Sequence, residues 1–153
     1  TCHTGPALNQ ENYYALGFKD MEVEFGPAPD AATRKGRGGF TGVKADEYKF
    51  KVPQLYNLKN ATSLGHGGSF QSQDEQSAVE QIIRYKLKGQ SENPEVPLTQ
   101  LAPEFTQMTQ VPFTEDEIHA LVRFIENGLY DPNLSRYEPT QLPSGQRIIN
   151  NDP

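Results

Sequence analysis

Two stretches of the chain carry apolar residues at the spacing of one helical face. The first is preceded by Ser77, which stands where a helix N-cap is expected, with Glu80 three residues later as its capping-box partner. Gly89 then provides a stop, since glycine readily takes the left-handed backbone that ends a helix. The pattern predicts a helix over residues 77–89. Its apolar face consists of Val79, Ile82, Ile83 and Leu87.

The second stretch gives the clearest helical pattern in the chain. Thr114 and Glu117 form a second capping box, and Gly128 lies near the far end. We therefore expect a helix from about residue 114 to residue 128. His119 is placed by the same periodicity on the solvent side. The apolar face consists of Ile118, Leu121, Val122 and Ile125.

The remaining chain predicts long irregular connections. It contains 13 Gly and 12 Pro, and the glycines and prolines between residues 17 and 51 interrupt the chain too often for long regular elements. A short helix is expected over residues 1–16, and an extended segment at Phe50–Val52, because the residue before Pro53 is driven out of the helical region. The fold class is mainly α, a domain of residues 1–130 followed by an extended polar tail over 131–153.

Composition excludes several classes of function. The net charge of −6 argues against a nucleic-acid binder, and no stretch approaches the roughly 20 apolar residues that cross a bilayer. No glycine-rich phosphate loop, paired-cysteine zinc site or nucleophile triad is present. One stretch of the chain is rich in basic residues. It is either a solvated loop or a contact for haem propionates or an acidic redox partner. Its cations are Arg34, Lys35, Arg37, Lys44, Lys49 and Lys51.

The pair Cys2-His3 carries the candidate chemistry. It matches the second half of Cys-x-x-Cys-His, in which two thiols form thioethers to haem and the adjacent imidazole binds iron. The first cysteine of that motif would fall two places before Thr1, so either the chain begins inside the motif or haem is held by one thioether. An apolar fraction of 35% is low, and a large apolar cofactor would help such a chain complete its core.

Several further motifs follow in a fixed order, and their order is more specific than any one of them. They are Gly36–Gly42 (GRGGFTG), Asp46, Phe50–Leu58 (FKVPQLYNL), Gly65–Phe70 (GHGGSF), the helix to Gly89, and the helix that ends FIENGL at Leu129. This series, over residues 1–140, resembles the bacterial di-haem cytochrome c peroxidase family, including its tryptophan-modifying relatives.

The resemblance implies a cytochrome c-like helical haem domain, the C-terminal one of the two in that family. That domain usually relays electrons to a peroxide-reducing haem, which lies in the other domain, so this fragment alone would not be catalytic. The implied partners are a second haem domain and a small redox protein, in a periplasmic or otherwise extracytoplasmic location. Alternatives are a non-catalytic electron-wiring or structural subunit of a larger complex, and a haem-free remnant used for binding.

The resemblance also assigns site residues. Cys2 matches the second thioether cysteine and His3 the proximal iron ligand. Tyr85 falls where family members place the distal ligand, and packing against haem or core is the alternative for this residue. Met108 competes as distal ligand, and core filling is its alternative. His66 matches a histidine expected to line the haem pocket, to bind iron or to satisfy carbonyls in a turn.

Three lesser expectations complete the sequence-based picture. The family binds calcium between its domains, which would involve backbone carbonyls near Ala61 and Ser63. Met21, in an acidic loop, is a weaker candidate ligand than Met108. Aromatic residues are expected to pack the haem pocket or the core; they are Phe18, Phe40, Phe50, Tyr56 and Phe70.

Overall fold

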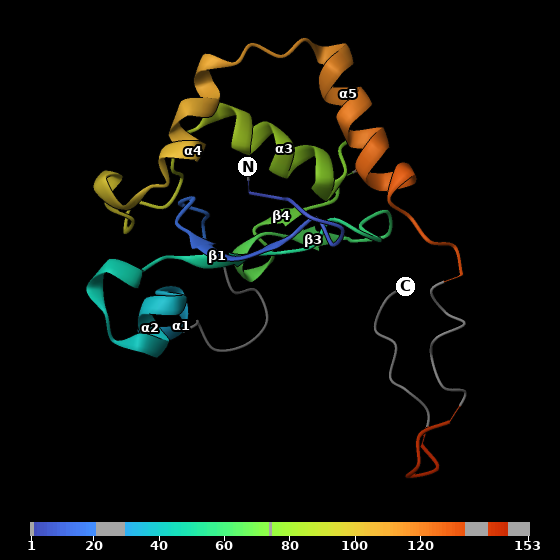
Figure 1. Cartoon of the computed structure of the whole chain (residues 1–153), viewed down its shortest axis with the longest axis horizontal. Coiled ribbons are helices and arrows are strands. Elements are labelled where there is room, and N and C mark those ends of the chain that lie inside the picture. The colour runs from blue at the N-terminus through green and yellow to red at the C-terminus, as the bar shows by residue number, and fades with distance from the viewer. Residues whose placement is uncertain (1, 21–29, 74, 134–140, 147–153) are drawn as a thin grey trace.

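Helices dominate the structure, a computed structural model that describes residues 2–20, 30–73, 75–133 and 141–146. Helix α3 crosses the middle of the molecule, α4 and α5 flank it, and α1 and α2 lie together at one side (Figure 1). The helices are α1 (Ala31–Arg34), α2 (Arg37–Thr41), α3 (Ala78–Lys88), α4 (Pro103–Thr106) and α5 (Glu115–Arg123). Short turns of 3-10 helix are η1 (Lys44–Asp46), η2 (His66–Gly68), η3 (Leu98–Gln100) and η4 (Gln107–Gln110), and η5 (Phe124–Gly128) is a π turn.

Two small antiparallel sheets accompany the helices, so the expectation of a mainly α domain holds with this addition. Strand β1 (Gln10–Tyr14) pairs with β2 (Phe50–Val52), and β3 (Ser63–Leu64) pairs with β4 (Phe70–Gln71). The extended segment expected before Pro53 is confirmed as β2. Between residues 30 and 51 the helices are four and five residues long, as the glycine-rich sequence predicts.

Both helices predicted from periodicity are confirmed, together with their ends. Ser77 Oγ accepts a hydrogen bond from the Glu80 amide at 3.1 Å, and Gly89 closes α3 with φ of +59°. At α5, Thr114 Oγ1 accepts from the Glu117 amide at 3.3 Å while the Thr114 amide donates to Glu117 Oε2 at 2.9 Å. The α5 helix continues through η5 to Gly128, and His119 is exposed as expected.

The helix expected over residues 1–16 is wrong. Gly5 and Leu8 both take positive φ, +68° and +47°, and the Leu8 amide donates to the Gly5 carbonyl at 3.1 Å, which closes a turn. Beyond that turn the chain is a strand, with Tyr14 opposite Phe50 in the β1–β2 register. A nonlocal partner decides this segment, because β2 offers backbone hydrogen bonds that residues 10–14 satisfy only in an extended form.

The core is divided into two clusters that share helix α3. We call one the aromatic cluster; its buried members are Phe70, Tyr85, Val96, Leu101, Ala102 and Phe105. We call the other the aliphatic cluster; its buried members are Val79, Ile83, Ile118, Val122 and Ile125. The first lies between α3, β4 and α4, and the second joins α3 to α5. Helix α3 therefore buries side chains on two adjoining faces.

The C-terminal segment is anchored at its start. The Asn57 amide donates to the Leu129 carbonyl at 3.1 Å, and the Asp131 amide donates to Asn57 Oδ1 at 2.8 Å. The later turn over residues 141–146 lies apart from the helices (Figure 1). An extended polar tail that docks on a partner stays a prediction, since much of it lies outside the described residues.

Removing the capping hydroxyl of α5 tests the local origin of that helix. We expect Thr114→Ala to lower the free energy of unfolding by about 1 kcal/mol, because the Glu117 amide loses its acceptor. The matched control is Thr99→Ala, since Thr99 is exposed in η3 and makes no hydrogen bond within the described residues. Urea unfolding followed by far-UV circular dichroism measures both. If both variants lower the free energy of unfolding equally, the capping role of Thr114 is contradicted.

The C-cap of α3 allows a second paired test. Alanine is strained by about 1 kcal/mol at both Gly89 and Gly42, where φ is +59° and +68°. At Gly89 the added Cβ would also lie 2.8 Å from the Phe105 carbonyl oxygen, whereas at Gly42 nothing lies within 4 Å. We therefore expect Gly89→Ala to lower the melting temperature further than Gly42→Ala. A larger effect at Gly42 would show that α3 does not need this close approach to α4.

Candidate functional site

The Cys2-His3 pair lies in the N-terminal turn, and His3 is held in a defined orientation. His3 Nδ1 lies 2.9 Å from the Leu8 carbonyl oxygen. A carbonyl oxygen can only accept, so Nδ1 carries the proton and Nε2 keeps its lone pair. Hydrogen bonding of one ring nitrogen to a carbonyl is how proteins usually orient a histidine that binds metal through the other. Cys2 is a free, half-buried thiol beside it.

The surroundings of His3 favour the neutral imidazole. Burial lowers the pKa of His3 most strongly, and the positive charge of Lys86 lowers it further. The backbone carbonyls of Leu8 and Pro53 oppose this shift, because hydrogen bonds to both would stabilise the doubly protonated ring. The net effect is a pKa below the ordinary value, so the imidazole is neutral near pH 7. A neutral imidazole is the form that binds iron.

Tyr85 lies at the centre of the aromatic cluster, 2% exposed. Its hydroxyl donates to the Leu16 carbonyl at 2.6 Å, and its ring stacks on Phe105 with centroids 5.5 Å apart. Burial raises the pKa of Tyr85 to about 12, which keeps the hydroxyl protonated as a donor. The packing role foreseen for Tyr85 is therefore present in the structure. Its assignment as an iron ligand stays a prediction.

Met108 is placed differently. It lies half-buried in η4 and belongs to neither apolar cluster. The Val111 amide donates to its carbonyl at 3.1 Å, so the backbone here closes the short turn before α5. Nothing in the described chain brings Met108 to His3, and its role as distal ligand also stays a prediction. Met21 lies outside the described residues.

His66 is part of a compact turn, as the flanking glycines predict. Gly65 has φ of +84°, and His66 Nε2 lies 2.7 Å from Asp20 Oδ1. The His66 ring packs on Phe50 with centroids 4.0 Å apart. Burial lowers the pKa of His66 and the Asp20 carboxylate opposes that shift. These contacts tie η2 to β2, and a role in a cofactor pocket stays a prediction.

The aromatic residues named from sequence separate into buried and exposed groups. Phe18 and Phe70 meet edge to face, with ring centroids 5.5 Å apart, and both join the aromatic cluster. Phe40 is 93% exposed, so its expected place in a pocket or core is wrong for this chain. The reason is position: α2 is five residues long and Phe40 sits near its end, beyond the reach of either cluster. Tyr56 is exposed, and its hydroxyl donates to the Pro6 carbonyl at 2.7 Å.

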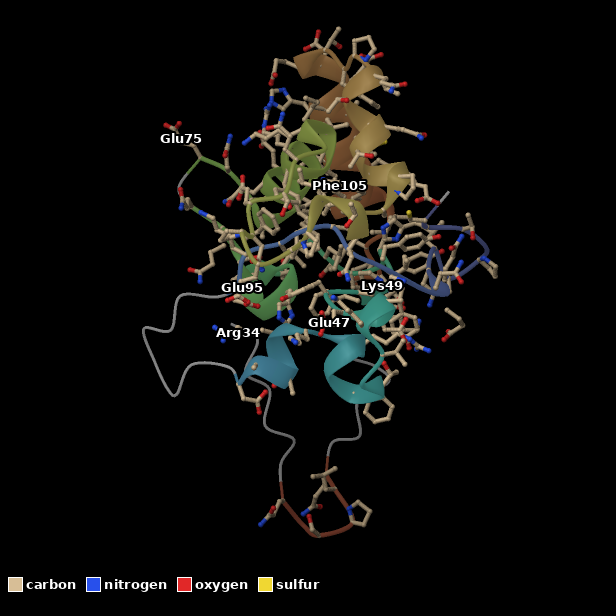
Figure 2. The ribbon with its side chains drawn as sticks, turned by 90° about the vertical axis from the view of Figure 1, so that its left-hand side faces the viewer. Arg34, Glu47, Lys49, Glu75, Glu95 and Phe105 are labelled. Atoms are coloured by element: carbon tan, nitrogen blue, oxygen red, sulfur yellow. The ribbon has the colours of Figure 1, made fainter. Side chains whose placement is uncertain are left out.

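The basic stretch is largely neutralised by acidic neighbours. Arg34 lies below Glu95, 3.9 Å from it, while Glu47 and Lys49 lie near α2 (Figure 2). The remaining pairs are Lys35–Glu47 at 2.7 Å, Arg37–Asp46 at 3.1 Å, Lys49–Asp46 at 4.0 Å and Lys51–Glu11 at 3.2 Å. Five of the six cations thus have a partner within the described chain. These ion pairs agree with a solvated loop, and contact with haem propionates or an acidic redox partner stays a prediction.

A surface cavity lies away from the candidate ligands. It measures about 330 Å³ and lies between α3, α5 and the segment that joins η4 to α5; its lining is Arg84, Leu87, Lys88, Val111, Phe113 and Ile118. None of Cys2, His3, Tyr85 and Met108 lines it. Across the described residues, no three His, Cys, Asp or Glu side chains gather as a metal site. The calcium site suggested near Ala61 and Ser63 stays a prediction.

One site residue was missed from the sequence. Lys86 follows Tyr85 on α3, and its charge acts on both His3 and Cys2. Helical spacing gives the signal that could have found it, since Lys86 is four residues after Ile82 and three after Ile83. When only apolar residues are counted in the helical pattern, a lysine on the same face is missed.

Comparison with known proteins supports the fold. No family model matches the chain, and no curated protein is significantly similar to it. Solved structures do match, among them a MauG-like protein associated with microbial copper homeostasis, with a TM-score of 0.62 and 19% sequence identity. The match covers 87% of this chain and 42% of that one, so this chain spans less than half of its structural neighbour. At this identity the likeness concerns the fold.

No helix in the described part of the chain has the length and apolar content to cross a membrane.

The Tyr85 hydroxyl allows a direct test of its packing role. We expect Tyr85→Phe to lower the free energy of unfolding by about 1–2 kcal/mol, because the Leu16 carbonyl loses its donor in a buried setting. The matched control is Tyr56→Phe, which removes a similar bond at the surface, where water replaces it. Chemical denaturation of both variants measures the difference. If Tyr85→Phe leaves the free energy of unfolding unchanged, the hydroxyl makes no stabilising hydrogen bond to the Leu16 carbonyl.

Proposed function

We propose that this chain is a c-type haem domain that transfers electrons, and that it belongs to a di-haem protein resembling the bacterial cytochrome c peroxidases. Cys2 would form a thioether to haem and His3 would bind its iron from the proximal side. When bound, haem would take up and release one electron. In this proposal the domain relays electrons to a second, peroxide-reducing haem in a partner domain.

The orientation of His3 is the observation that carries the proposal. The hydrogen bond from Nδ1 to the Leu8 carbonyl leaves Nε2 with the lone pair that iron requires. A hydrogen bond from the other ring nitrogen to a carbonyl is the usual way in which a metal-binding histidine is oriented. The adjacent thiol of Cys2 is half-buried on the same turn, which fits a thioether. These residues therefore fit the cofactor that their sequence motif implies.

Two further observations support the family. The order of motifs from Gly36 to Leu129 resembles that family, and the fold is similar to that of a MauG-like protein. A small redox protein as electron donor, a second haem domain as partner and an extracytoplasmic location follow from the same proposal. Calcium at the domain interface would belong to it as well.

Absorption spectra of the protein, produced in full length in a host that attaches haem to cysteine, provide the test. We expect a c-type spectrum that changes on reduction, with the pyridine haemochrome of a thioether-linked haem. His3→Ala should remove the low-spin signal of this haem, because the iron loses its proximal ligand. Cys2→Ala should abolish covalent attachment at this site, measured by mass spectrometry of the denatured protein.

His119→Ala is the control, since His119 is exposed on α5 and far from the motif in sequence. It should leave both the spectrum and the attached mass unchanged. If no haem is attached through Cys2 in the unmodified protein, the electron-transfer proposal is wrong and a haem-free binding domain takes its place. If haem is attached but no electron passes to a second haem in rapid-mixing experiments, a structural or wiring subunit is favoured.

A further inference from the structure

The orientation of His3 depends on the turn that follows it. The Leu8 amide donates to the Gly5 carbonyl at 3.1 Å, so these two residues close a β-turn. Leu8 itself takes a φ of +47°, a left-handed conformation that is unfavourable for a residue with a side chain. In this conformation the Leu8 carbonyl oxygen lies 2.9 Å from His3 Nδ1. A change in the shape of the turn would therefore move the acceptor of the His3 ring.

The central peptide of that turn is held by a residue distant in sequence. It joins Pro6 to Ala7, and the Tyr56 hydroxyl donates to the Pro6 carbonyl at 2.7 Å. A β-turn changes type when its central peptide turns over, which reverses this carbonyl and requires a positive φ at the third residue of the turn. That residue is Ala7, which has no positive φ in the structure. The bond from Tyr56 thus holds the peptide in the orientation that suits Ala7.

Tyr56 can serve as an anchor because the backbone on both sides of it is fixed. Strand β2 ends shortly before it at Val52, which pairs with Gln10 of β1. On the other side, the Asn57 amide donates to the Leu129 carbonyl at 3.1 Å, which ties the segment to the end of η5. A hydroxyl on such a segment can position the turn to which it is bonded.

The other bonds of the turn act at its ends. A bridge between Thr4 and Asn9 closes the base of the turn, and β1 then pairs with β2. These bonds determine where the turn begins and where it ends. The Tyr56 hydroxyl acts inside it, on the peptide that leads to Leu8. Within the described residues, no other group donates to the Pro6 carbonyl.

We propose that Tyr56 is a positioning residue for the haem ligand His3. Through the Pro6 carbonyl, its hydroxyl holds the turn that keeps the Leu8 carbonyl beside His3 Nδ1. This inference rests on the proposed haem function and adds how the chain sets the reduction potential. A hydrogen bond from Nδ1 makes the imidazole a stronger electron donor through Nε2. A stronger donor favours ferric iron, so this bond lowers the potential and its loss raises it.

A redox titration of the full-length, haem-loaded protein provides the test. Electron paramagnetic resonance follows each haem separately, and the low-spin ferric signal that His3→Ala removes identifies the haem concerned. We expect Tyr56→Phe to raise the reduction potential of this haem, because the turn loses its anchor and the bond between His3 and Leu8 loosens. The free energy of unfolding should change little, since water replaces an exposed hydrogen bond. A purely structural role of Tyr56 would not move the potential.

The His3 Nδ1 proton gives a second readout, closer to the proposed contact. It is followed by proton NMR of the reduced protein, in which the resonance that His3→Ala removes identifies it. A proton that is bonded to the Leu8 carbonyl exchanges slowly with solvent. We expect Tyr56→Phe to make this exchange several-fold faster.

Tyr130→Phe is the matched control. The Tyr130 hydroxyl makes no hydrogen bond within the described residues, and the ring that Lys59 contacts is retained in the variant. The potential and the exchange rate should both stay unchanged in this control. If Tyr56→Phe also leaves both unchanged, or if Tyr130→Phe alters them equally, the inference is overturned.

Failure of the inference is distinct from failure of the proposed function. A protein that carries haem on Cys2 but does not respond to Tyr56→Phe retains the function and loses only the positioning role. A protein in which no haem is attached through Cys2 loses both. Tyr56→Phe removes one oxygen atom from an exposed residue and keeps its ring, so it tests the bond without disturbing either apolar cluster.

Discussion

Helix α3 has to satisfy several neighbours at once, and the arrangement of the domain follows from that constraint. Its Tyr85 completes the aromatic cluster with α4 and β4, while Val79 and Ile83 complete the aliphatic cluster with α5. An eleven-residue helix has about three turns, so these two faces take up much of its circumference. The exposed remainder carries Arg84, whose guanidinium binds Glu115 at the start of α5. Helix α3 thus contacts α4, α5 and β4 at once.

The N-terminal segment is held against this framework mainly by backbone hydrogen bonds. The Gly17 carbonyl accepts from the amides of Glu92 and Asn93, and the Ala15 carbonyl accepts from the Ala102 amide at 2.9 Å. An added Cβ at Gly17, where φ is +68°, would collide with the Ser91 side chain. The connection that follows α3 therefore closes over residues 15–17. These bonds hold the segment after the Cys2-His3 turn against the connection that follows α3.

Sequence alone predicts the parts of this fold whose causes are local. A capping hydroxyl and its partner lie three residues apart, so the ends of α3 and α5 can be found without knowledge of the remainder. Strand β1 depends on β2, about forty residues away, and the apolar residues of the segment led to the expectation of a helix there instead. Phe40 shows the same limitation, because whether an aromatic residue is buried depends on which element comes to cover it.

The candidate site was predictable to a similar degree. Cys2 and His3 stand in a recognisable pair, but the hydrogen bond that sets the His3 tautomer comes from Leu8, which no motif identifies. The resemblance to the family identified Tyr85 by its position, and the structure showed how its side chain packs. No motif identifies Lys86 either, whose positive charge lowers the pKa of His3. A polar residue within an apolar face is a sequence signal in its own right, provided that the whole face is read.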